Sequence, residues 1–243
     1  MHTLTLNKKT IANNFYKSRS VYEENALVQR KMAQKLVSFL DTSYDTVLEI
    51  GCGTGMLTKL VYGSCHFKNY YAIDIIEKNK EFLTEGFPKL HYTCFDMDMI
   101  ENFCPGQNFD LILSNAAIQW STNPKLLIQS CMERLNPQGT LALAFFGEKN
   151  FSEIKDIFNV GLTYLSQDEL NEIGKKYDIV HSSQEILELH FPDTISLLRH
   201  IKNTGVGGMS RTAVKKEHLR QYAQKHQNIL TYNPVYCILK KHS

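Results

Sequence analysis

The stretch from Val47 to Leu57, VLEIGCGTGML, restricts the possible folds more than any other part of the chain. Its apolar run, TVLEI, alternates little and ends at a turn, which is typical of a buried parallel strand. Glycines follow at every second position, at Gly51, Gly53 and Gly55, before MLTKLV continues with helical spacing. A strand, a glycine loop and a helix in this order form the first unit of an α/β nucleotide-binding fold. Glycine lets the backbone turn tightly and lets a ligand approach without a Cβ atom in the way.

The loop does not match a dinucleotide-binding site. That fingerprint requires G-x-G-x-x-G, and Met56 stands where its third glycine would be. Glu49 lies at the end of the strand, where its carboxylate would repel a pyrophosphate. A carboxylate beside the loop suits a cationic group such as the ammonium of an amino acid. This points to S-adenosylmethionine, which carries an amino-acid end and a sulfonium but no phosphate.

An acidic residue follows about one βα unit later. The stretch NYYAIDII, residues 69–76, reads as a second strand that ends near Asp74. A carboxylate there accepts hydrogen bonds from ribose hydroxyls. The same residue could instead cap a helix or lie in a solvated loop, so both interpretations remain open. After a glycine loop of this kind, the ribose interpretation is the one we favour.

In these residues the chain resembles the class I S-adenosylmethionine-dependent methyltransferases from about Thr46 to Phe146. The resemblance includes HYTCFDMD, in which Asp96 occupies the position that usually contacts the adenine amino group, and the strands FDLILSN and GTLALAFFG. It implies a Rossmann-like α/β fold, with a seven-stranded, mostly parallel sheet and helices on both faces. The cofactor-binding residues that it implies are Glu49, Gly51, Cys52, Gly53, Gly55, Asp74, Ile75, Asp96, Met97, Asn115 and Ala116.

Composition excludes several classes of protein. The 243 residues are 43% hydrophobic and 21% charged, which is ordinary for a globular domain. No apolar run approaches the roughly 20 residues of a membrane helix, and the first residues lack the apolar core of a secretion signal. The six cysteines show no zinc-site spacing. We therefore expect a soluble, cytoplasmic protein without a metal.

The chain shows three zones within a single domain. Residues 1–45 form a helical lead-in or lid, with one helix expected from about Val21 to Leu40. Residues 46–191 and 229–243 form the methyltransferase core, whose last strands are expected at 184–191 and 233–241. Between these strands, TISLLRHIKNT and AVKKEHLRQYAQKH have helical patterns. Such a long intervening segment is typical of a lid or binding element, so residues 192–228 are expected to be a helical insertion on the substrate side.

Three further stretches narrow the resemblance. SNAAIQW follows the fourth strand, FPDTISLLRHIKNTGVGG begins the insertion, and NNFYKSRSVYEENALVQ lies near the N-terminus. Together they are similar to the malonyl-[acyl-carrier protein] O-methyltransferases of biotin synthesis, and the resemblance then spans nearly the whole chain. It implies that the free carboxylate of a malonyl thioester, on acyl carrier protein or coenzyme A, receives the methyl group. The products would be a methyl ester and S-adenosylhomocysteine, and neither nucleic acid nor membrane would take part.

The implied chemistry needs orientation rather than a general base. A carboxylate is already ionised at neutral pH, because its unperturbed pKa is about 4. It does need a positive anchor, and arginine matches two oxygens with its planar fork. We expect Arg199 and Tyr22 to position the reactants. The substrate or carrier contacts that we expect are Tyr16, Lys17, Trp120, Arg199, His200 and Lys202, and ordinary packing or solvent exposure is the alternative for each of them.

Basic residues are concentrated at the end of the chain. From residue 199 to 243 there are nine lysines or arginines and one acidic residue. Arg199, Lys202, Arg211, Lys215, Lys216 and Arg220 could steer an acidic carrier protein, although a charge run can also be a solvated face. The alternatives are a methyltransferase for another small carboxylic acid or a quinone precursor, and a non-catalytic cofactor-binding interaction protein.

Overall fold

The computed structural model describes residues 2–3, 7–83, 86–206 and 214–242. The chain forms two compact units. The first unit comprises Met1–Val28, Phe146–Tyr164 and Glu185–Pro234, and the second comprises Gln29–Phe145, Leu165–Gln184 and Val235–Ser243.

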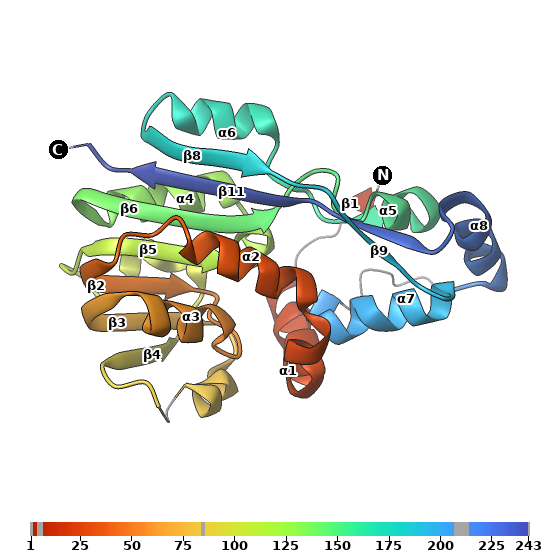
Figure 1. The fold of residues 1–243 in the computed structure, drawn as a ribbon, viewed down its shortest axis with the longest axis horizontal. Coiled ribbons are helices and arrows are strands. Elements are labelled where there is room, and N and C mark those ends of the chain that lie inside the picture. Colours follow the sequence, from red (N-terminus) through yellow and green to blue (C-terminus); the bar gives the residue numbers. More distant parts are fainter. Residues whose placement is uncertain (1, 4–6, 84–85, 207–213, 243) are drawn as a thin grey trace. The chain divides into compact units, whose positions relative to one another are not determined.

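Strands and helices alternate through the middle of the chain (Figure 1). The strands are β1 (His2–Thr3), β2 (Ser43–Ile50), β3 (His66–Asp74), β4 (Leu90–Cys94), β5 (Phe109–Asn115), β6 (Leu135–Phe146), β7 (Val160–Gly161), β8 (Asp178–Gln184), β9 (Leu187–His190), β10 (Ile229–Tyr232) and β11 (Pro234–Lys240). The α-helices are α1 (Lys8–Asn25), α2 (Leu27–Val37), α3 (Met56–Ser64), α4 (Pro124–Glu133), α5 (Ser152–Phe158), α6 (Gln167–Gly174), α7 (Thr194–Ile201) and α8 (Lys216–His226). Shorter helical turns are η1 (Glu77–Phe82), η2 (Met97–Asn102), η3 (Ile118–Trp120) and η4 (Lys202–Val206).

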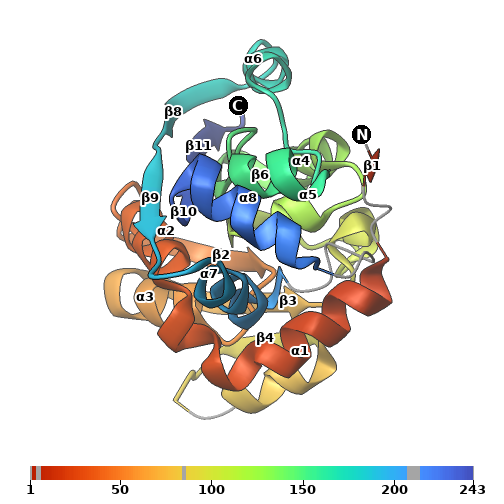
Figure 2. The same ribbon diagram turned by 90° about the vertical axis from the view of Figure 1, so that its right-hand side faces the viewer.

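The predicted seven-stranded, mostly parallel sheet is confirmed. Its strand order is β4-β3-β2-β5-β6-β11-β8. The pairs β3–β4, β2–β3, β2–β5 and β5–β6 are parallel, whereas β11 and β8 are antiparallel. Helices α2 and α3 cover one face and α4 covers the other, as both views show (Figures 1 and 2). The carboxyl ends of the parallel strands therefore meet along one edge, where ligands of such sheets bind.

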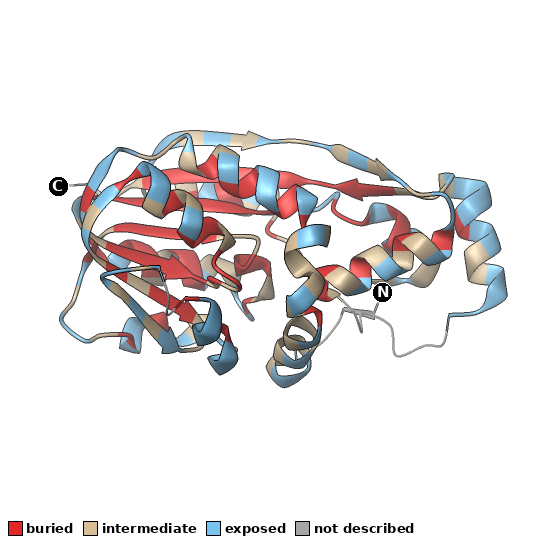
Figure 3. Cartoon of the chain, turned by 60° about the horizontal axis from the view of Figure 1, so that its bottom comes forward, coloured by how far each residue is buried: buried red, intermediate tan, exposed pale blue. Residues whose placement is uncertain are grey.

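The hydrophobic core of the second unit lies between the seven-stranded sheet and its helices. The central strands are buried almost throughout, as the red ribbon of Figure 3 shows. Leu48 and Ile112 of the sheet pack in one cluster with Leu127 and Ile128 of α4. Strands that are buried on both faces must be almost wholly apolar, which is why the sequence revealed them without a clear alternation.

The single helix expected from Val21 to Leu40 is wrong in its extent. The structure has two helices there, α1 and α2, which are separated at Ala26. Ala26 has ψ 48°, outside the helical range, and its N–H donates to the Tyr22 carbonyl oxygen at 2.8 Å. The first helix begins much earlier than expected because Asn7 caps it: the Asn7 side chain accepts from the Thr10 N–H at 3.1 Å.

The strand expected at 184–191 is in fact divided between two sheets. Strand β8 ends at Gln184 and lies at the edge of the seven-stranded sheet, whereas β9 pairs antiparallel with β10 in a separate ribbon. The strand expected at 233–241 corresponds to β11, and β10 precedes it. The two helical patterns between β9 and β10 form α7 and α8, so the helical insertion is confirmed. Asp193 caps α7 by accepting from the Ser196 N–H at 2.7 Å.

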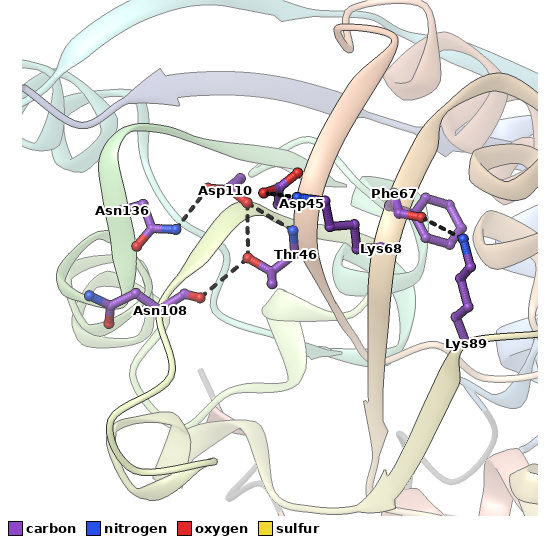
Figure 4. Close-up of polar contacts among 8 residues, drawn as sticks. All are labelled: Asp45, Thr46, Phe67, Lys68, Lys89, Asn108, Asp110 and Asn136. Carbon is purple, nitrogen blue, oxygen red and sulfur yellow. Dashed lines mark hydrogen bonds and ion pairs between the residues drawn. The ribbon is translucent and has the colours of Figure 1, made fainter.

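Asp110 ties together three strands of the sheet (Figure 4). Its Oδ2 accepts from the N–H and the hydroxyl of Thr46 on β2, at 2.8 and 2.9 Å. Its Oδ1 accepts from Nδ2 of Asn136 on β6 at 2.7 Å. Nearby, Lys68 and Asp45 form an ion pair of 2.7 Å in which the side chains are 72% and 65% exposed. The hydrogen bonds from Thr46 to Asp110 are thus partly buried, whereas the Lys68–Asp45 ion pair is exposed to solvent.

Replacing Asp110 with alanine should lower the free energy of unfolding by about 1–3 kcal/mol, because several hydrogen bonds to a charged acceptor are lost. The matched control is Asp45→Ala, which removes only the exposed ion pair and should change stability by less than about 1 kcal/mol. Urea denaturation of both variants measures the difference. Equal losses in the two variants would contradict the role given to Asp110.

Candidate functional site

The glycine loop between β2 and α3 is fastened to the end of β3. The N–H groups of Gly51 and Cys52 both donate to the Ile73 carbonyl oxygen, at 2.8 and 3.2 Å. Gly51 has φ +70°, and a Cβ atom there would lie 2.3 Å from the Cβ of Ala117. Only glycine fits at this position, since any larger residue would be strained and would displace the segment after β5. The loop therefore packs against the carboxyl end of β5.

Asp74 holds the loop from the other side. Its Oδ2 accepts from the Gly53 N–H and its Oδ1 accepts from the Ile76 N–H, both at 2.9 Å. Burial raises the pKa of Asp74, and these hydrogen bonds, with one from the Asn79 side chain, partly offset the effect. The carboxylate thus organises two loops. Each of its oxygens has a second lone pair, so it can also accept from a ligand hydroxyl.

The other residues predicted along this edge lie directly after β3 or after β4. Asp96 caps η2, and its Oδ1 accepts from the Asp98 N–H at 3.0 Å. Ile75 is 37% exposed and Met97 is partly buried. Asp98, which the sequence analysis did not identify, accepts from the Thr122 N–H at 3.0 Å and so connects η2 to the segment after β5. No motif distinguishes Asp98 from a solvated acid, which is why it was missed.

Glu49 is a buried carboxyl group beneath the loop. It is 1% exposed, and its Oε2 accepts from the hydroxyls of Thr58 and Tyr70, both at 2.6 Å. Burial raises the pKa of Glu49 to about 7, although the two hydroxyl donors oppose the shift. At neutral pH this group is therefore close to its titration midpoint. A cation brought near it would favour the ionised form.

The carboxyl end of β5 carries buried acceptors that lack donors. Asn115 donates from Nδ2 to the Gln29 carbonyl oxygen at 3.0 Å, and Ala116 has φ +53°. Within the described part of the chain, the side-chain oxygens of Gln29, Asn115 and Gln119 are buried without a hydrogen-bond partner. Buried polar atoms of this kind are uncommon and call for an explanation. Gln29 and Gln119 were not predicted as site residues, since a lone glutamine carries no sequence signal.

The expected substrate residues on α7 and η4 differ in exposure. Arg199 and Lys202 are exposed. His200 is half-buried instead, and its Nε2 lies 2.8 Å from the Tyr232 hydroxyl. Burial lowers the pKa of His200, so the ring is neutral at physiological pH. Arg211, which we expected in the same basic group, lies outside the described residues.

The aromatic residues expected near the substrate are partly buried. The rings of Tyr22 and Phe15 meet edge to face at 6.4 Å, and the Arg19 guanidinium lies 4.4 Å from the ring of Tyr16. Lys17 is exposed. Trp120 ends η3 in the other unit and is also partly buried.

The described part of the chain holds neither a metal-binding cluster nor a membrane-spanning helix. No cluster of three or more histidine, cysteine or acidic side chains is arranged to hold a metal ion within residues 2–3, 7–83, 86–206 and 214–242. In the same part of the chain, no helix combines the length and the apolar character needed to cross a membrane.

This chain is similar to known methyltransferases. A family model described as a methyltransferase domain matches residues 48–143. A malonyl-[acyl-carrier protein] O-methyltransferase of Calditerrivibrio nitroreducens is 36% identical over 96% of both chains. One from Acinetobacter baylyi is 31% identical over 99% of both chains. In structure, the N-methyltransferase NodS of Bradyrhizobium japonicum, in complex with S-adenosyl-L-homocysteine, aligns over 88% of this chain and 86% of its own with TM-score 0.53 and 13% identity.

The raised pKa of Glu49 predicts how stability depends on pH. A carboxyl group whose pKa is higher in the folded state lowers stability as pH rises from its ordinary value of 4.5 to about 7, and the loss is complete above that. The full difference corresponds to about 3 kcal/mol. Glu49→Gln does not titrate and still offers an oxygen to both hydroxyls. It should therefore gain stability over the wild type across this pH range.

Thermal unfolding from pH 4 to 9 measures the gain, and Glu24→Gln, an exposed glutamate on α1, is the matched control. A constant difference between Glu49→Gln and the wild type at all pH values would exclude a raised pKa for Glu49.

Proposed function

Because the chain belongs to the malonyl-[acyl-carrier protein] O-methyltransferase family, we propose that it methylates the free carboxylate of a malonyl thioester on acyl carrier protein, with S-adenosylmethionine as methyl donor. The observation that carries this proposal is 36% identity over 96% of both chains to a protein with that name. The product would be a malonyl methyl ester, made early in biotin synthesis.

The residues at the carboxyl edge of the sheet fit the methyl donor. When bound, the cofactor supplies a methyl group activated by a sulfonium. The glycine loop leaves open space at Gly53, where an added Cβ atom would meet no described atom within 4 Å, and Asp74 has lone pairs left for ribose hydroxyls. Ile75, Asp96 and Met97 would line the adenine. The oxygen of Asn115, which has no donor among the described residues, suits a donor on the amino-acid end, and NodS, which has a similar fold, was solved in complex with S-adenosyl-L-homocysteine.

The reaction requires alignment more than acid–base chemistry. The malonyl carboxylate is ionised at neutral pH, so one of its oxygens can attack the methyl carbon while the carbon–sulfur bond breaks and sulfur keeps the electron pair. No proton moves in this step. The chain's task is to hold the carboxylate in line and to exclude water, and orientation of this kind can contribute several kcal/mol, up to about 7–11.

A basic surface on the insertion would receive the carrier protein. Arg199 and Lys202 are exposed at α7 and η4, and Lys215, Lys216 and Arg220 are exposed at the start of α8. Such a surface would accelerate the association of an acidic carrier and set its approach. In this proposal Arg199 anchors the carboxylate and residues 192–228 form the substrate side.

The N-terminal segment completes the proposed substrate site. Residues 1–45 would close over the reactants, with Tyr22 near the transferred methyl group. Tyr16, Lys17 and Trp120 would contact the malonyl arm.

The proposed activity predicts a specific change in mass. Incubation of malonyl-carrier protein with the protein and S-adenosylmethionine should add one methylene to the malonyl group, as measured by intact-mass spectrometry. Succinyl-carrier protein and malonyl-coenzyme A serve as comparisons for chain length and carrier. If the malonyl carrier gains no mass while the protein binds the cofactor, another small acid or a non-catalytic role becomes the better explanation.

The anchoring role of Arg199 can be separated from carrier docking. Arg199→Ala should raise KM about ten-fold with both malonyl-carrier protein and malonyl-coenzyme A, because a charge-assisted hydrogen bond to the shared carboxylate is lost. Lys176→Ala, which neutralises an exposed lysine of the other unit, should leave both values unchanged. If the KM of Arg199→Ala rises with the carrier protein alone, Arg199 acts in docking. If KM rises with neither substrate, Arg199 is not part of the site.

A further inference from the structure

Three buried amide oxygens belong to neighbouring residues at and beside the end of β5. They are Oε1 of Gln29, Oδ1 of Asn115 and Oε1 of Gln119, and within the described residues none has a hydrogen-bond donor. The two glutamine residues are only 4% and 5% exposed. An amide oxygen kept from water without a donor costs stability. We call these three side chains the acceptor cluster.

Hydrogen bonds hold the acceptor cluster together and orient its oxygens. Asn115 donates from Nδ2 to the carbonyl oxygen of Gln29 at 3.0 Å. Gln119 donates from Nε2 to the carbonyl oxygen of Ala116 at 2.7 Å. Turning either amide over would break these bonds and would place a donor where the oxygen now lies. The amide nitrogens of Asn115 and Gln119 are thus engaged, while the oxygens remain available.

The acceptor cluster lies beside the first glycine of the loop. Ser114, the residue before Asn115, donates from its hydroxyl to the Ile50 carbonyl oxygen at 2.9 Å. Gly51 comes so close to Ala117 that a Cβ atom on it would lie 2.3 Å from the Ala117 side chain. The ends of β2 and β5, and with them the loop and the cluster, are therefore in direct contact.

The ligand group that faces these oxygens must be a hydrogen-bond donor, because all three are acceptors. An ammonium group has three N–H donors and no acceptor. We propose that Gln29 and Gln119, with Asn115, bind the α-ammonium group of S-adenosylmethionine and of its product. The inference rests on cofactor binding in the proposed function and is independent of which carboxylic acid accepts the methyl group.

Calorimetric titration with two ligands tests the inference. S-adenosylhomocysteine carries the ammonium, and 5′-S-(3-carboxypropyl)-5′-thioadenosine is the same molecule without it. Gln29→Met and Gln119→Met should each weaken S-adenosylhomocysteine binding by about ten-fold or more, as expected when a hydrogen bond to a charged group is lost. Binding of the analogue should change little. Gln34→Met, an exposed glutamine on the same helix as Gln29, is the matched control and should bind both ligands as the wild type does.

A second readout does not depend on ligand affinity. Without ligand, Gln29→Met should unfold at the same temperature as the wild type or higher, because an unpaired buried oxygen has been removed.

Gln29→Glu keeps an acceptor at this position and should retain S-adenosylhomocysteine binding.

The outcomes separate this inference from its premise. Equal weakening of both ligands in Gln29→Met and Gln119→Met, or no weakening of either, would overturn the ammonium site and leave cofactor binding intact. Failure of the wild type to bind S-adenosylhomocysteine would instead overturn the cofactor premise, and the ammonium site with it.

Discussion

The carboxylate of Asp74 is the point on which the ligand edge of the sheet depends. One of its oxygens holds the Gly53 N–H and the other holds the Ile76 N–H. These bonds join the loop after β2 to the turn after β3, so the two loops form one surface. The backbone N–H groups of Gly51 and Cys52 reinforce the connection by donating to β3. Without this attachment, three glycines at alternate positions would leave the loop free to adopt many conformations.

The same edge of the sheet contains groups that lower stability in the absence of a ligand. Glu49 is a buried carboxyl group whose pKa is raised to about 7, and the acceptor cluster holds amide oxygens without donors. At the opposite edge, Asp110 satisfies its neighbours by accepting hydrogen bonds from two other strands. Polar groups that are unsatisfied at one end and satisfied at the other are the expected result when one edge binds a ligand and the other only supports the fold.

Sequence reasoning succeeded where burial left a strong local pattern. The strands β2, β5 and β6 are nearly continuous apolar runs, and the glycine loop has an unmistakable spacing. It failed at β8, whose residues DIVHSSQ are mostly exposed because the strand lies at the sheet edge. The prediction also merged part of α1 with α2, since no residue type around Ala26 indicates the change of ψ that separates the two helices.

The sequence by itself determined the α/β class, the glycine loop and the resemblance that leads to the methyltransferase family, because periodicity, glycine spacing and motifs are local properties of the chain. Tertiary structure alone decided what each polar residue contacts. Asp74 binds two backbone N–H groups, His200 turns toward Tyr232, and Gln29 lies beside Asn115, 86 positions away in the chain. These contacts depend on which strand and helix ends meet in space, and no local pattern encodes that. The buried oxygen of Gln29, which has no donor among the described residues, therefore became visible only in the folded chain.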